Sequence, residues 1–104
     1  MKRHFKLEFN PNIQFDIQHQ VDYYYKETQS HELGKRFVKV VKKEFLRLKK
    51  HALQYEIKYD DIRCLPIPKF PFRAHYRVDE KNHSVKVEAL ISTHQSPDNW
   101  VKRK

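Results

Sequence analysis

Three side chains that could bind an anion recur at every second position in the last third of the chain: Arg73, His75 and Arg77. Alternate residues of a β-strand point to the same side of a sheet, so this spacing places all three on one face. Guanidinium groups on a rigid strand suit bidentate binding of a phosphate or a carboxylate. The arginines could instead form cross-strand ion pairs with Glu88 or with Asp79–Glu80. The spacing alone leaves both roles open.

Neighbouring side chains could extend this face. Arg63 would join it from the preceding strand and Lys86 from the following strand. We expect Tyr76 to lie in the core, with its hydroxyl reaching a partner at the edge. Trp100 lies in a basic tail, where packing is the simpler expectation and base stacking is the alternative.

Other kinds of chemistry lack the residues that they need. The seven histidines are scattered, and no pair of histidines, nor a histidine with Cys64, has the spacing of zinc ligands. Cys64 has no motif around it and is expected to fill the core. The chain has no Gly-Lys-Ser/Thr phosphate loop and no serine elbow. We therefore expect neither a metal nor a cofactor.

The composition predicts one small basic domain over residues 1–104, because a chain of this length buries a single core. The formal net charge of +9 indicates an anionic partner, a nucleic acid or an acidic protein segment, with a merely soluble basic surface as the alternative. A single cysteine, no signal-peptide pattern and no run of about 20 apolar residues predict a soluble cytoplasmic protein.

Hydrophobic periodicity predicts a strand followed by two helices. Residues 4–9 alternate between polar and apolar side chains, as in a half-buried strand. Asn10 offers a helix cap and Pro11 suits the first helical position, so a helix is expected from there to about Thr28. After a polar break at residues 29–32, a second helix should bury a stripe that includes Phe37 and Val41.

The other face of this second helix carries eight lysines and arginines between residues 35 and 50. A solvated surface is the default interpretation of such a face. The short break between the helices predicts an antiparallel hairpin that packs on a sheet.

A meander of three strands is expected in the second half of the chain. Residues 61–67 suggest a short strand, which Pro66 and Pro68 confine to an edge or end early, because neither proline can donate a ladder hydrogen bond. Residues 70–78 and 84–92 alternate on either side of a turn at residues 79–82, whereas residues 53–59 show no clear pattern. In the last strand the odd positions 85–91 are expected to face inward, and Leu90 outward. The order β-α-α-β-β-β predicts an α+β domain, a helical hairpin on a small, mainly antiparallel sheet.

Several phrases of the sequence resemble the RelE/ParE superfamily, the small bacterial toxins of toxin–antitoxin pairs. The densest spans residues 63–80 and reads Arg-Cys-Leu-Pro-Ile-Pro-Lys-Phe-Pro-Phe-Arg-Ala-His-Tyr-Arg-Val-Asp-Glu. Residues 33–37, Leu-Gly-Lys-Arg-Phe, and 97–100, Pro-Asp-Asn-Trp, also match. The resemblance covers nearly the whole chain. It implies the toxin of a type II toxin–antitoxin (plasmid stabilisation) system, neutralised by a cognate antitoxin in a hetero-oligomer.

The superfamily implies two mechanisms: ParE-like toxins bind DNA gyrase without being enzymes, and RelE-like toxins cut messenger RNA in the ribosomal A site. The nucleases use sheet arginines with a tyrosine or histidine near the C-terminus. By resemblance, Arg73 is the sheet arginine, and His94 could titrate near neutrality. Residues 92–95 lack the arginine that family members commonly carry, and Trp100 stands where a nuclease tyrosine would lie. These departures favour ParE-like inhibition. The alternatives are an mRNA endoribonuclease using Arg73 and His94, and an inactive toxin-fold binding module.

The expected surface for the antitoxin or the target is the basic sheet face, with Leu65 and Leu90 as apolar contacts. Its expected members are Arg63, Lys69, Arg73, His75, Arg77, Lys86, Leu90, Gln95, Trp100 and Arg103.

Overall fold

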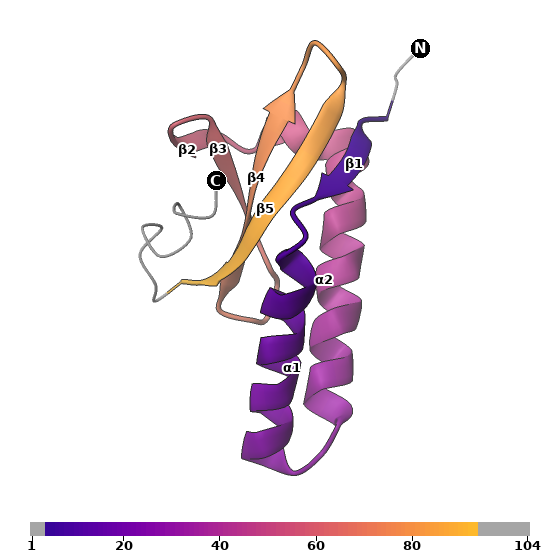
Figure 1. The fold of residues 1–104 in the computed structure, drawn as a ribbon, viewed down its shortest axis with the longest axis vertical. Helices are drawn as coiled ribbons and strands as arrows, with labels where there is room; N and C mark the ends of the chain where they lie inside the picture. The colour runs from indigo at the N-terminus through magenta and orange to yellow at the C-terminus, as the bar shows by residue number, and fades with distance from the viewer. Residues whose placement is uncertain (1–3, 94–104) are drawn as a thin grey trace.

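The computed structural model describes residues 4–93, which form two α-helices, a short 3-10 helix and five strands (Figure 1). The elements in chain order are β1 (Lys6–Phe9), α1 (Ile13–Thr28), α2 (Glu32–His51), η1 (Ala52–Gln54), β2 (Ile57–Tyr59), β3 (Ile62–Pro66), β4 (Phe72–Asp79) and β5 (Ser84–Ser92). Across residues 4–93, neither α-helix is both long and apolar enough to cross a membrane.

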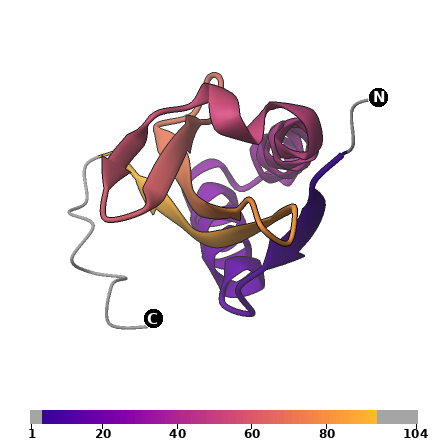
Figure 2. The same cartoon turned by 90° about the horizontal axis from the view of Figure 1, so that it is seen from above.

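The strands form one sheet in the order β1-β5-β4-β3-β2. β1 runs parallel to β5, and the other neighbours are antiparallel. Figure 2 shows β1 and β2 at the two ends of the sheet. The predicted α+β architecture is confirmed, with β2 as an additional strand. β2 is short and its pairing with β3 shifts register between Ile57 and Tyr59, which explains why the sequence alternates only weakly there.

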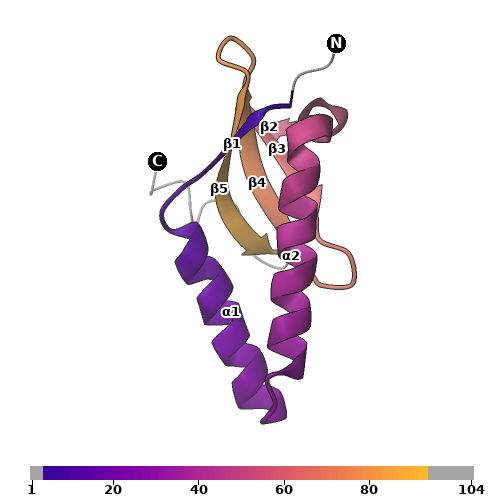
Figure 3. The ribbon, with the colours of Figure 1, turned by 90° about the vertical axis from the view of Figure 1, so that its right-hand side faces the viewer.

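The two helices form the predicted hairpin, whose turn lies beyond the end of the sheet (Figures 1 and 3). α1 begins at Ile13 rather than at the proline, because Asn10 heads a turn of its own. The Oδ1 atom of Asn10 accepts the N–H of Asn12 at 2.8 Å, and its carbonyl accepts the N–H of Ile13 at 2.9 Å. The helices approach closely at Gly34, where a Cβ atom would lie 3.1 Å from Cγ1 of Val21.

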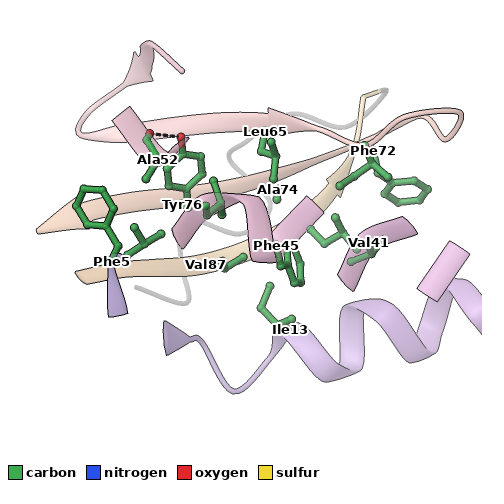
Figure 4. Close-up of a cluster of buried hydrophobic side chains, with 14 of the residues drawn as sticks. Phe5, Ile13, Val41, Phe45, Ala52, Leu65, Phe72, Ala74, Tyr76 and Val87 are labelled. Carbon is green, nitrogen blue, oxygen red and sulfur yellow. Dashed lines mark hydrogen bonds between the residues drawn. The ribbon is translucent and has the colours of Figure 1, made fainter. Parts of the chain in front are cut away.

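The main core lies between the helices and one face of the sheet (Figure 4). The predicted stripe of α2 is buried there, and burying each large apolar side chain stabilises the fold by about 1.5–3 kcal/mol. Tyr76, from the middle of β4, is fully buried, and its hydroxyl donates to the carbonyl oxygen of Ala52 at 2.5 Å. The predicted core position of Tyr76 is confirmed. Its hydrogen bond joins the sheet to η1 at the end of α2.

A β-bulge at Glu88 changes the two faces of β5. Between positions 75 and 76 of β4, the partner in β5 moves from residue 89 to residue 87, so Glu88 has no residue opposite it. One extra residue reverses the side to which the following side chains point. Leu90 therefore lies in the main core, and Ala89 and Ile91 form a second cluster with Ile62. The expected outward position of Leu90 and inward positions of Ala89 and Ile91 are wrong.

Candidate functional site

The face of the sheet opposite the helices, called the outer face below, carries the three β4 residues singled out in the sequence. Arg73, His75 and Arg77 alternate with residues of the main core, so they share this face as predicted. Arg73 is exposed, Arg77 is half-buried and His75 is buried. These environments give the three side chains different roles.

Arg77 is held by two carboxylates. Its Nε donates to Glu88 Oε2 at 2.9 Å, and its Nη1 donates to Oδ1 and Oδ2 of Asp61 at 3.0 and 2.9 Å. The Glu88 carboxylate also accepts a hydrogen bond from Asn10 Nδ2 at 3.1 Å and lies 3.9 Å from the exposed Lys86 Nζ. Arg77 thus forms the cross-strand pair that the spacing left open, and this network joins β4 and β5 to the turn before β3 and to Asn10 at the end of β1.

Arg63 lies on the helix side of the sheet, so the expectation that it joins the outer face is wrong. It is the cross-strand partner of Tyr76, and directly opposed residues point to the same side of a sheet. Its Nη1 donates to the Tyr55 carbonyl at 2.6 Å. Leu65, like Leu90, is buried in the main core, so neither offers an apolar contact on the outer face. The strand register decides these positions, and a period of two does not reveal it.

A cavity of about 650 Å³, called the outer cavity below, opens beside β2 and β3. The Tyr59 hydroxyl is hydrogen-bonded to Nδ1 of His75 at 2.7 Å, and Cys64 Sγ lies 3.7 Å from the same nitrogen. Cys64 and His75 meet because they are cross-strand partners, which their sequence separation did not indicate. The lining residues are Gln54, Tyr55, Glu56, Lys58, Tyr59, Cys64, Pro66, Arg73 and His75.

Burial, with a smaller contribution from nearby Arg73, lowers the pKa of His75 to about 4. Burial also raises the pKa of the Cys64 thiol, although the positive charges of Arg73 and Lys58 oppose this effect. Both groups are therefore neutral at pH 7, where the thiol is a poor nucleophile and the imidazole a weak base. Arg73 adds a permanent, exposed positive charge. The outer cavity is suited to binding an anionic or polar group rather than to covalent chemistry.

The other expected site residues are spread more widely. Lys69 is exposed in the turn between β3 and β4. His94, Gln95, Trp100 and Arg103 lie outside the described residues. Within residues 4–93, no three histidine, cysteine or acidic side chains are grouped so that they could hold a metal ion.

A second surface, which the sequence did not lead us to expect, lies between β1 and α2. This β1–α2 groove has a volume of about 550 Å³ and is lined by His4, Phe5, Lys6, Leu7, Phe9, Lys42, Phe45, Leu46 and Lys49. Phe9 and Leu46 line it although they are 44% and 57% exposed. An adjoining groove of about 390 Å³ shares Phe9, Lys42 and Phe45 and continues along α1. The signal in the sequence was Leu46, an apolar residue within the basic side of α2.

The fold and its two surfaces define a small α+β protein with the RelE/ParE-like arrangement of a helical hairpin on a five-stranded sheet. A chain of the chromosomal ParDE TA (toxin–antitoxin) system from P. aeruginosa has this fold, with a TM-score of 0.72, 16% sequence identity, and coverage of 88% of the present chain and 98% of that chain. The isolated RelE toxin of E. coli is also similar, with a TM-score of 0.47, 16% identity, and coverage of 95% and 97%.

No protein-family model matches the sequence, and no curated protein is significantly similar to it. At 16% identity, the similarity to the ParDE chain establishes the fold. The RelE/ParE-like fold expected from the sequence is therefore confirmed.

Proposed function

We propose that this chain is the toxin of a type II toxin–antitoxin system and that it acts by ParE-like inhibition of DNA gyrase. The observation that carries this proposal is the fold, which matches a chain of a ParDE system over almost the full length of both chains. The resemblance of residues 63–80 to the superfamily supports it independently, because it rests on residue types rather than on backbone shape.

The outer cavity supports binding in preference to RNA cleavage. Attack by a 2′-hydroxyl needs a group that accepts its proton and cations that stabilise the phosphorane. His75 has a pKa of about 4 and is buried, so it is a weak base at pH 7. Of the arginines expected to act there, Arg63 and Arg77 are held by internal partners, which leaves Arg73 exposed.

One observation favours the second candidate, an mRNA endoribonuclease: the exposed Arg73 lies beside a cavity large enough for a nucleotide. Two assays on the purified protein separate the candidates. Gyrase supercoiling of relaxed plasmid should be inhibited, and ribosome-bound mRNA should stay intact. Cleavage of that mRNA, abolished by Arg73→Ala or His94→Ala, would replace the gyrase proposal with the nuclease.

We further propose that the antitoxin covers the β1–α2 groove, rather than the basic sheet face, with an acidic amphipathic segment. The groove combines exposed apolar side chains with a cationic rim, because Phe9 and Leu46 lie beside Lys42 and Lys49. An amphipathic helix would bury its apolar side against the first pair and place carboxylates near the second. The outer cavity would then remain available for the target.

A matched pair of substitutions tests this location. Leu46→Glu places a negative charge in the β1–α2 groove. Leu53→Glu places the same charge in η1, at a position where the leucine is 45% exposed and does not line the groove. Binding would be measured to the product of a short reading frame beside this gene. Because burying a leucine is worth about 1.5–3 kcal/mol, Leu46→Glu should weaken binding roughly 10–100-fold, and Leu53→Glu should not. Equal affinity of both variants would place the antitoxin elsewhere.

A further inference from the structure

The outward side of α2 carries cations that neither the outer cavity nor the β1–α2 groove uses. α2 lies at the surface, with the sheet and α1 on its other side (Figure 3). Three lysines spaced by seven residues border hollows of the surface: Lys42 and Lys49 line the β1–α2 groove, and Lys35, together with Lys42 and Lys39, lines a third groove beside Gly34. The next positions round the helix form what we call the open cationic face, which consists of Arg36, Lys39, Lys43, Arg47 and Lys50, all exposed.

The charges of the open cationic face are almost entirely uncompensated. Arg47 pairs with Glu44 at 3.3 Å, and no other cation of α2 has a carboxylate of the described residues within 4.0 Å. Lys39, Lys43 and Arg47 also follow one another at intervals of four residues. Like charges at this spacing destabilise a helix. An anionic partner would relieve this repulsion.

The open cationic face is long enough to lie along several phosphates of a nucleic acid backbone. The fourteen-residue step from Arg36 to Lys50 spans roughly 21 Å at a rise of about 1.5 Å per residue. One strand of a B-form duplex carries a phosphate about every 3.4 Å of axis, so α2 could run alongside roughly six phosphates. The cations recur once per helical turn along this length and can therefore reach several of them.

We propose that the open cationic face binds the phosphodiester backbone of a nucleic acid duplex without reading its sequence. Between residues 35 and 50 there is no Asn, Gln, Ser or Thr, and the two aromatic residues, Phe37 and Phe45, are buried. The face thus offers no side chain suited to base edges or stacking beyond its cations, which suit phosphates. An acidic peptide would bind more favourably to the grooves than to this face, because it could contact apolar side chains there as well as cations. The proposal goes beyond gyrase inhibition and leaves the groove free for an antitoxin.

The test is fluorescence anisotropy of the purified protein with labelled 20-base-pair duplexes of scrambled sequence, one of DNA and one of RNA, between 50 and 200 mM KCl. Four cations of the face are not engaged by a carboxylate, so the slope of the logarithm of the association constant against the logarithm of the salt concentration should be about −3.6 for DNA. The affinity for DNA should therefore fall roughly 100-fold over this range of salt. The triple variant Arg36→Gln/Lys43→Gln/Lys50→Gln should reduce the slope by nearly three.

The control is Lys35→Gln/Lys42→Gln/Lys49→Gln, which removes the same charge from the same helix on its groove side. It should change the slope by less than one, and circular dichroism should show both variants folded. A preference for DNA or for RNA would identify which nucleic acid supplies the backbone. Equal loss in the two variants, no binding at 50 mM KCl, or tighter binding of polyglutamate than of either duplex would overturn the proposal.

Discussion

Acid should destabilise this protein through His75, in a pH range set by its burial. The imidazole is 6% exposed, and burial, with the added repulsion of Arg73, lowers its pKa from 6.5 to about 4. Above pH 6.5 the side chain is neutral in both the folded and the unfolded state. As the pH falls from 6.5 to about 4, His75 becomes protonated in the unfolded chain but stays neutral in the folded chain. Stability is therefore fully present above pH 6.5 and is lost toward pH 4.

The size of this effect follows from the two pKa values. They differ by about 2.5 pH units, and each unit corresponds to about 1.4 kcal/mol. The free energy of unfolding should therefore fall by about 3 kcal/mol between pH 7 and pH 4 through this one group. That is a large part of the 5–15 kcal/mol that is typical of a folded domain.

The assay is urea unfolding, followed by far-UV circular dichroism at intervals from pH 7 to pH 4, on the wild type and His75→Gln. Glutamine does not titrate and can still hydrogen-bond the Tyr59 hydroxyl. Whatever the substitution costs at pH 7, the variant should gain about 3 kcal/mol relative to the wild type by pH 4. His31→Gln, on an exposed histidine, is the control for replacing an imidazole with an amide. A His75→Gln curve that runs parallel to the wild type would refute the assigned role of His75.

Three further substitutions test the fold by urea unfolding at pH 7. Tyr76→Phe removes the buried hydrogen bond to η1 and should lower the free energy of unfolding by about 1–3 kcal/mol, because a carbonyl loses its donor. Glu88→Gln weakens the charged hydrogen bond from Arg77 and should cost about 2 kcal/mol. Gly34→Leu adds a side chain at a position where even a Cβ atom would lie 3.1 Å from Cγ1 of Val21, and overpacking should cost about 1–3 kcal/mol.

Exposed counterparts serve as controls for these substitutions. Tyr23→Phe, at a tyrosine that is 51% exposed, should change the free energy of unfolding by less than about 0.5 kcal/mol. Glu56→Gln removes an exposed ion pair with Lys58 and should cost less than about 1 kcal/mol. If a buried substitution costs no more than its exposed control, the contact assigned to it does not stabilise the fold.

The elements with strong periodicity were predictable because local pattern and tertiary packing agree in them. The apolar stripe of α2 and the alternation of β4 predicted correctly which face of each element is buried. Phe37 and Tyr76 are among the fully buried residues. β2 was not predictable, because it is a short edge strand with an irregular pairing. Its side chains are mostly exposed, so they carry no hydrophobic pattern.

The candidate site was predicted only in part, because register is a tertiary property. The shared face of Arg73 and His75 follows from period two within one strand. The bulge at Glu88 could not be predicted in this way, because no glycine or proline marks the point at which it reverses the alternation of β5. The position of Arg63 and the meeting of Cys64 with His75 depend on how β3 aligns with β4. No spacing along the chain encodes that alignment.

The most direct test of the central proposal is viable-cell counting after induced expression of this chain in bacteria, alone and together with the short reading frame beside its gene. The chain alone should reduce viable counts, and co-expression of the neighbour should restore them. Relaxed plasmid DNA in the arrested cells would mark gyrase as the target. Unchanged viable counts at a confirmed level of folded protein would contradict the proposal that this chain is a toxin.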